Sequence, residues 1–477
     1  MSTEGSDVAS SRRGRMRERR SRRFVVAMAA VVGALALVGG ASGVLTTVQG
    51  PRVTATSVDP QAGIESAGSR LIVTTTQSLE EVDPAQVHIE PAADFTVDTS
   101  GRQIGIRFVL PLRDATDYTV RIDGVTGLGG GPAATIEQSF STPALETYIL
   151  QRGGDEDTIF RTVLDGESAV PVFTDPRIED FRATSTHLAI VTADDEGVST
   201  LVVTDRDGEG ARELSLPGRG FVTNLQTADR GDLIGYTFTD AAIGSGGGLE
   251  SALFTTSLAD GRSDDEPARL QFAGGDARVD DWRFVPGTDA VLLLGFDGAL
   301  TLVSAGGGEP VSLGNAITID GIARGSTEAI VQRASGLVAI DLATAEERPL
   351  SAADAADGET QSVTALPGDA DETLRVLSQV DGFTVLETSA AVVGADGATR
   401  DVFSVAPGDL LLHTCVSPSS RYAAFLVAPD AVSNPYDAYL LPLPERVQTH
   451  IVDLGTGEEV SALNGFDVSW CQSAPRP

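Results

Sequence analysis

RIEDFR, at residues 177–182, recurs almost residue for residue as RVDDWR at residues 278–283, and more weakly as IDGIAR at residues 319–324. Each copy precedes a pair of apolar runs with the alternation typical of β-strands. A motif that returns along a chain is the sequence signature of a repeat architecture. We therefore expect the region from about residue 146 onward to consist of similar β-units stacked side by side.

Gly-rich or Asp-rich turns punctuate the same region at a nearly regular interval. Their spacing is about 45 residues, which is the size of a four-stranded propeller blade. The sequence therefore predicts an all-β protein with a β-propeller over residues 146–473 and a short tail over 474–477, and seven blades are preferred over six or eight. The turns lie near residues 165–166, 207–208, 260–261, 306–307, 343–344, 396–397 and 455–457.

Two further segments resemble the TolB-like, or WD40-like, β-propeller, whose blades carry a W-S-P-D-G turn followed by an I-A-F strand. The better copy is VSPSSRYAAF at residues 416–425, and a looser one is FVPGTDAVLL at residues 284–293. The resemblance covers the whole predicted propeller. It implies a binding scaffold rather than one particular activity.

The last repeat-like segment, FDVSWC at residues 466–471, reads like the start of another unit. A propeller must close, because its first and last blades would otherwise expose unpaired strand edges. We therefore expect this segment to supply a strand to the first blade. In that register Cys415 and Cys471 hold equivalent positions at the seam, which favours a disulfide between them. Two buried free thiols are the alternative.

An earlier unit, residues 52–143, is predicted to be a β-sandwich of seven short strands separated by Pro, Gly and Asp. The predicted strands are residues 53–58, 71–75, 87–89, 95–97, 104–109, 118–122 and 136–140. The unit resembles bacterial Ig-like domains of the S-layer type in SVDPQAG at 57–63, VDPAQV at 82–87, YTV at 118–120 and FST at 140–142. That resemblance implies a spacer or adhesive module that carries no chemistry.

The N-terminus predicts the location of the protein. Residues 1–23 hold eight Arg against three acidic residues, and residues 24–48 carry no charge. A helix of that length, at about 1.5 Å per residue, spans a hydrocarbon core of about 30 Å. The basic tail is expected to stay in the cytoplasm, which makes the chain a single-pass protein of the cell membrane with its C-terminal domains outside. Cleaved export is the alternative, although ASG at 41–43 is a poor cleavage site. This layout is similar to that of actinobacterial surface proteins.

The formal net charge is −34, and every basic residue is Arg. A surface this acidic gains nothing from polyanions, so nucleic acid is excluded as a partner. We expect contact with the membrane through the N-terminal helix, and a protein or an envelope polymer as the binding partner.

The candidate ligand-binding residues share a predicted place near the mouth of the propeller channel. Arg can grip a carboxylate through two parallel hydrogen bonds, so a ring of Arg side chains would suit an anionic ligand. The alternative is pairing between blades with Asp180, Asp281 and Asp320, which would neutralise the ring. The candidates are Arg182, Arg283, Arg324 and His413.

Metal, cofactor and catalytic signals are weak. Asp205, Asp207 and Glu209 are spaced like the start of a calcium loop, but Leu216 stands where a bidentate Glu should close it, and a hairpin turn explains the same residues. The four His show no zinc-ligand spacing, and the sequence has no hydrolase elbow, P-loop or dinucleotide fingerprint. We assign no catalytic residue, metal or cofactor, and no enzyme activity.

These observations favour a membrane-anchored binding or scaffolding protein at the cell surface, with the Ig-like unit as spacer and the propeller as interaction platform. An envelope enzyme with its active site in the channel is one alternative. A purely structural envelope component is the other.

Overall fold

The computed structural model describes residues 50–475 except 167, 230–231, 245–247, 260, 263–264, 271–275, 354–357, 367–371 and 383, together with Met28. Apart from Met28, the predicted basic tail and transmembrane segment lie outside the described residues. Within the part of the chain that is described, no helix is long and apolar enough to cross a membrane.

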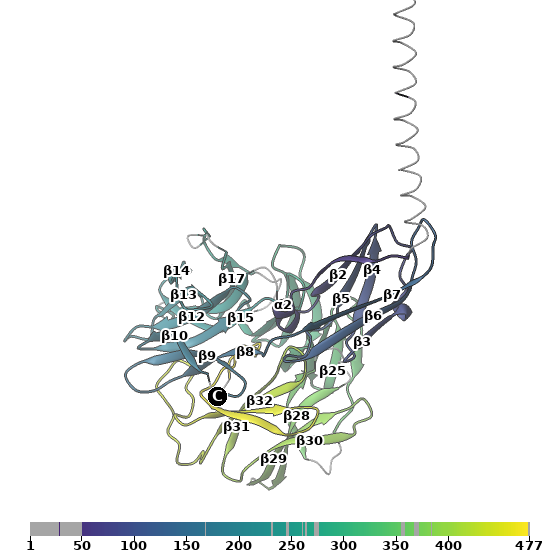
Figure 1. The fold of residues 1–477 in the computed structure, drawn as a ribbon. Coiled ribbons are helices and arrows are strands. Elements are labelled where there is room, and N and C mark those ends of the chain that lie inside the picture. The colour runs from purple at the N-terminus through teal and green to yellow at the C-terminus, as the bar shows by residue number, and fades with distance from the viewer. Residues whose placement is uncertain are drawn as a thin grey trace, which may run out of the picture.

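The N-terminal unit is a sandwich of two sheets, with strand orders β1-β2-β5-β4 and β3-β6-β7 (Figure 1). All seven predicted strands are present. The structure adds two short helices, each of which has an Asp cap followed by Pro. The elements are β1 (Val53–Ser57), α2 (Pro60–Glu65), β2 (Arg70–Thr75), η1 (Pro84–Gln86, a 3-10 helix), β3 (Val87–Glu90), β4 (Phe95–Ser100), β5 (Gln103–Phe108), β6 (Asp117–Val125) and β7 (Ala134–Ser141).

Seven further sheets follow one another along the chain, each made of consecutive antiparallel strands. The first sheet contains β8 (Glu146–Gln151), β9 (Asp157–Val163) and β10 (Val170–Asp175). The second contains β11 (Ile178–Ala183), β12 (His187–Ala193), β13 (Ser199–Asp205) and β14 (Arg212–Leu214). The third contains β15 (Gly220–Thr227), β16 (Leu233–Asp240), β17 (Ala252–Ser257) and β18 (Ala268–Arg269). The fourth sheet contains β19 (Val279–Phe284), β20 (Ala290–Gly295), β21 (Ala299–Ser304) and β22 (Val311–Asn315). The fifth contains β23 (Thr318–Ile322), β24 (Glu328–Arg333), β25 (Gly336–Asp341) and β26 (Glu347–Pro349). The sixth sheet contains β27 (Glu359–Ala365), β28 (Thr373–Asp381), β29 (Thr384–Val393) and β30 (Thr399–Val405). The seventh contains β31 (Leu410–Val416), β32 (Tyr422–Ala428), β33 (Gln448–Asp453) and β34 (Glu459–Asn464).

This succession of sheets is a β-propeller. The first strands of neighbouring sheets contact each other in the order β11, β15, β19, β23, β27, β31, so they form the inner wall of the ring. Every predicted turn falls between the last two strands of a sheet. Each TolB-like segment spans the turn between the first and second strands, and the start of the second strand, in the sheets that start with β19 and β31. Apolar clusters fill the space between adjacent blades, such as the cluster that joins Val203 of one blade to Tyr236 of the next.

The C-terminal segment closes the ring, as the sequence predicted. The backbone N–H and C=O of Phe466 form two hydrogen bonds of 2.9 Å with those of Leu150 in β8, and the N–H of Ser469 donates to the carbonyl of Tyr148 at 3.0 Å. The segment therefore lies on the inner side of β8 and completes a blade that would otherwise have three strands. Cys471 then forms a disulfide with Cys415 of β31, with 5.4 Å between the Cα atoms.

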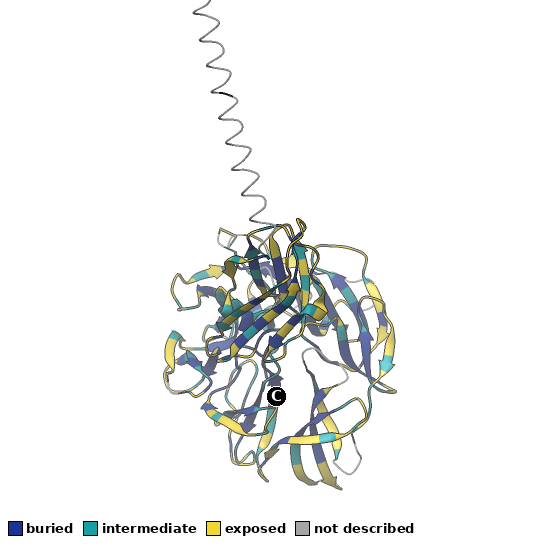
Figure 2. Ribbon diagram, turned by 45° about the vertical axis from the view of Figure 1, so that its right-hand side comes forward, coloured by how far each residue is buried: buried dark blue, intermediate teal, exposed yellow. Residues whose placement is uncertain are grey.

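The sandwich packs directly against the propeller. One apolar cluster contains Phe108 of the sandwich together with Tyr422 and Trp470 of the propeller. Buried residues, dark blue in Figure 2, occur along the strands of both units. Two ion pairs cross the boundary, Arg206–Glu65 at 2.7 Å and Arg421–Asp114 at 3.3 Å. The sandwich thus covers part of one face of the propeller and would form a wall of any site on that face.

Candidate functional site

Two cavities meet at the centre of the propeller. The interface cavity, of about 730 Å3, lies between the sandwich and the propeller face. The channel cavity, of about 340 Å3, is lined by the inner strands β19, β23, β27 and β31 and by the C-terminal segment. The side chains that line both cavities are Arg283, Arg324, Trp470 and Gln472. The two spaces are therefore neighbours at the channel mouth.

Arg182 is not part of either lining, and the prediction that it binds a ligand finds no support in this position. Its side chain is 2% exposed and pairs with Asp180 at 3.0 Å and with Asp467 at 2.6 Å. Asp180 lies two residues earlier on the same strand, and Asp467 belongs to the closing segment. The pairing with Asp180 is thus within a strand rather than between blades, and the contact with Asp467 secures the seam.

The three charges of this triad are fully buried, and burial controls how they titrate. Desolvation raises the pKa of Asp180 to about 8, and the neighbouring Asp467 carboxylate adds to the rise. Burial likewise raises the pKa of Asp467. One guanidinium faces two carboxyl groups, so retention of a proton by Asp180 leaves the triad neutral. The triad thus joins the inner strand β11 to the closing segment.

Arg283 lies at the channel mouth. Its Nη1 pairs with Asp281, again two residues earlier on the same strand, and donates to the carbonyl of Trp282 at 2.7 Å. The side chain lines both cavities although it is only 8% exposed in total. The expected partner Asp281 is therefore in contact with Arg283, but on the same strand, while the charge of Arg283 also acts across the blade boundary on Asp320 of β23.

Arg324 lies one residue away from the position that the repeat predicted. A β-bulge interrupts the inner strand at Glu179, Asp280 and Asp320 in the three blades. Counted from the bulge, the equivalent of Arg182 is Ala323, and Arg324 follows the strand. Its Nη2 donates to the carbonyl of Trp470 at 2.9 Å, and the half-buried side chain lines both cavities.

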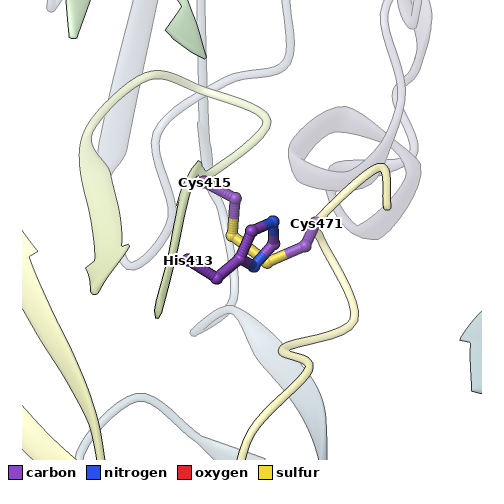
Figure 3. A group of neighbouring side chains, drawn as sticks. All are labelled: His413, Cys415 and Cys471. Carbon is purple, nitrogen blue, oxygen red and sulfur yellow. A yellow bond between two sulfur atoms is a disulfide. The ribbon is translucent and has the colours of Figure 1, made fainter. Parts of the chain in front are cut away.

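His413 and Asp320 both line the channel cavity. Desolvation raises the pKa of Asp320 to about 6, against the opposing effect of a hydrogen bond from Thr318. His413 is half-buried on β31 and lies beside the disulfide (Figure 3). A carboxyl group that titrates near neutrality and an imidazole in one cavity are groups that can exchange protons with a ligand.

The calcium candidates form a hairpin turn between β13 and β14. The Asp205 carboxylate accepts the backbone N–H of Asp207 at 3.0 Å and that of Glu209 at 2.8 Å. Asp207 pairs with Arg161 at 2.5 Å. These contacts give the carboxylates of Asp205 and Asp207 a local structural role.

Several residues of the interface cavity were not predicted. Arg107 comes from the sandwich, while Arg206 comes from a propeller turn and pairs with Glu65. Gly325 has φ +76°, and a Cβ there would come within 2.5 Å of Leu110 in the sandwich. The repeat pattern carries no signal for such residues, because they are brought together only by the docking of two separate units.

No family model and no curated protein matches the sequence. Among solved structures, the chain is similar to a protein described as TolB from Agrobacterium tumefaciens, with 15% identity, a TM-score of 0.35 and coverage of 68% of this chain and 90% of that one. It is also similar to the Cps50 (Swd1) β-propeller domain of Myceliophteria thermophila, with 14% identity, a TM-score of 0.39 and coverage of 61% and 86%. An oligogalacturonate lyase in complex with manganese has 9% identity, a TM-score of 0.46 and coverage of 85% and 98%. At identities of 9–15%, these likenesses select no activity.

Proposed function

We propose that this protein is a membrane-anchored binding protein of the cell surface, in which the interface cavity receives a segment of a partner protein or envelope polymer. The propeller supplies the floor, and the sandwich, as an Ig-like module, supplies a wall rather than a spacer alone. The anchor is the uncharged segment at residues 24–48. The acidic exterior keeps nucleic acid and anionic surfaces away from the site.

The observation that supports this proposal is the composition of the interface cavity. Its wall combines four Arg and four acidic side chains with Ser, Thr and Gln, so it offers donors and acceptors of both charges. A cavity of about 730 Å3 falls within the usual range of ligand pockets, about 300–1,000 Å3. Polar groups that converge from two rigid units suit recognition of an extended ligand by hydrogen bonds.

Site-directed photo-crosslinking in intact envelopes tests this function. A crosslinking residue replaces Ser185, which is exposed and lines the interface cavity. The matched control replaces Ala395, which is exposed in the outer turn between β29 and β30 and lines neither cavity. We expect a specific adduct from position 185 alone, weakened at least tenfold by Arg324→Gln. Equal adducts from both positions, or none from position 185, would contradict the proposal.

An enzyme is the second candidate, favoured by Asp320 and His413 in the channel cavity. In that case the full-length protein should release small products from envelope polymers. Product release should fall at least tenfold in Asp320→Asn and stay unchanged in Asp276→Asn, whose carboxylate is at the propeller surface next to Arg278. Equal rates for the two variants would remove the channel from consideration as an active site.

A further inference from the structure

His413, Cys415 and Cys471 form a cluster with the composition of a metal site. Their ligand atoms all lie within 4.8 Å of one another, and Figure 3 shows the imidazole beside the two sulfur atoms. Among the described residues, no other group of three His, Cys, Asp or Glu side chains brings its ligand atoms this close together. His413 and Cys415 lie two residues apart on β31, so their side chains project from the same face of the strand.

The cluster does not depend on the disulfide to stay assembled. The closing segment is held by the two hydrogen bonds between Phe466 and Leu150 and by that from Ser469 to Tyr148. The hydroxyl of Ser469 also accepts the N–H of Tyr148 at 3.1 Å, and Asp467 pairs with buried Arg182. Opening of the S–S bond would therefore leave Cys471 facing Cys415 across the seam.

The geometry suits one zinc ion once the thiols are free. Two thiolates on a tetrahedral zinc ion, with Zn–S bonds of about 2.3 Å, lie about 3.8 Å apart. The 5.4 Å between the Cα atoms of Cys415 and Cys471 allows this separation. Two soft thiolates and an imidazole form a donor set that zinc prefers over magnesium or calcium. His413 and Cys415 also line the channel cavity, which leaves room for water or a ligand at the fourth position.

We propose that Cys415 and Cys471 have two exclusive states, a disulfide and, with His413, a zinc site. A dithiol reductant delivers two electrons and two protons to the S–S bond, is itself oxidised to a disulfide, and yields two thiols. Binding of zinc then displaces both thiol protons. Removal of two electrons from the thiolates by an oxidant such as a disulfide restores the S–S bond and releases the ion. The site thus links the redox state of the seam to metal occupancy at the channel.

Metal titration of the full-length protein tests the proposal. The oxidised protein and the protein reduced with a dithiol, freed of reductant under anaerobic conditions, are each titrated with Co2+ and then Zn2+. We expect one equivalent of Co2+ with a thiolate-to-metal absorption band only in the reduced protein, and displacement of Co2+ by Zn2+. His413→Ala should weaken zinc binding at least tenfold. His88→Ala, which alters an exposed histidine of the sandwich, should leave it unchanged.

Three results would overturn the inference. The first is the absence of the thiolate band in the reduced protein. The second is equal zinc affinity in His413→Ala and His88→Ala. The third is loss of the β-sheet circular dichroism signal on reduction, since the site requires a seam that stays closed without the disulfide. Cys415→Ser with intact Cys471 provides a further check, because it should abolish the cobalt band while the closing segment remains paired.

Discussion

At the scale of single residues, the buried triad of Asp180, Arg182 and Asp467 is the most consequential polar feature. A buried charge without a partner is costly, whereas a paired one is tolerated. Arg182 therefore works as the counter-charge that lets an acidic closing segment enter the propeller core. The repeat placed Arg182 correctly on an inner strand, but only the partner on the other side of the seam gave it a role.

Arg182→Met should destabilise the folded chain strongly. The variant leaves two carboxyl groups buried without their cation, and loss of one partner of a buried pair costs about 3–5 kcal/mol. Equilibrium denaturation in urea measures the change. Arg219→Met is the control, because Arg219 pairs with Glu196 on the exposed surface and should contribute at most about 1 kcal/mol. Similar losses in the two variants would show that the triad is dispensable.

The same triad predicts how stability depends on pH. Unfolded Asp180 loses its proton near pH 4, whereas the folded chain keeps it until about pH 8. Between these values unfolding releases a proton from Asp180, so the contribution of this group to stability is greatest at the acidic end and falls as pH rises toward about 8.

Thermal unfolding measured between pH 6 and 8 tests whether stability falls as pH rises. This interval is chosen because Asp320, whose pKa is about 6, is largely ionised above that pH and contributes less to the change. Asp180→Asn should flatten the slope, because the amide stays neutral at every pH. Asp195→Asn, at an exposed turn, should retain the slope of the wild type. A wild-type stability that rises over this interval would contradict the assignment.

At the scale of elements, the loop after β23 joins the sandwich to the propeller. Gly325 adopts φ +76°, and a Cβ there would lie 2.5 Å from the Leu110 side chain. This loop also carries Arg324 and Ser326, which line the interface cavity. The contact therefore links the position of the sandwich to the shape of the site.

Gly325→Ala should loosen the docking of the sandwich, because the new methyl group displaces Leu110 in addition to straining the backbone. The matched control is Gly307→Ala, where φ is +95° but nothing lies within 4 Å of the added Cβ. Limited proteolysis of residues 143–146, between the sandwich and the propeller, should accelerate severalfold in the first variant only. Equal acceleration in both would attribute the effect to backbone strain alone.

At the scale of the whole molecule, stability depends on closure of the ring. The disulfide joins residues 56 positions apart. A loop of that size contributes about 4 kcal/mol through the entropy of the unfolded chain. The hydrogen bonds of the closing strand and the Arg182–Asp467 pair act in the folded state, so the two contributions are separable.

Cys415→Ser combined with Cys471→Ser should lower the free energy of unfolding by about 4 kcal/mol without opening the ring. Truncation after residue 465 should cost more, since it removes Phe466, Trp470 and the partner of Arg182 as well. Chemical denaturation ranks the two variants. A double Ser variant as unstable as the truncated chain would mean that the disulfide alone closes the propeller.

The sequence by itself determined the β-strands, the seven turns and the closing segment, because these follow from alternating apolar residues and from a repeat of constant length. It also placed Cys415 and Cys471 at one seam, since the repeat register relates distant positions. The tertiary structure decided which Arg reaches the channel, because the register of β23 places Ala323 and not Arg324 at the position of Arg182, and the Asp467 carboxylate pairs with Arg182. The tertiary structure also determined which residues line the interface cavity and which residues surround His413. Contacts between the two units and across the ring do not recur at the repeat interval, so the sequence pattern does not predict them.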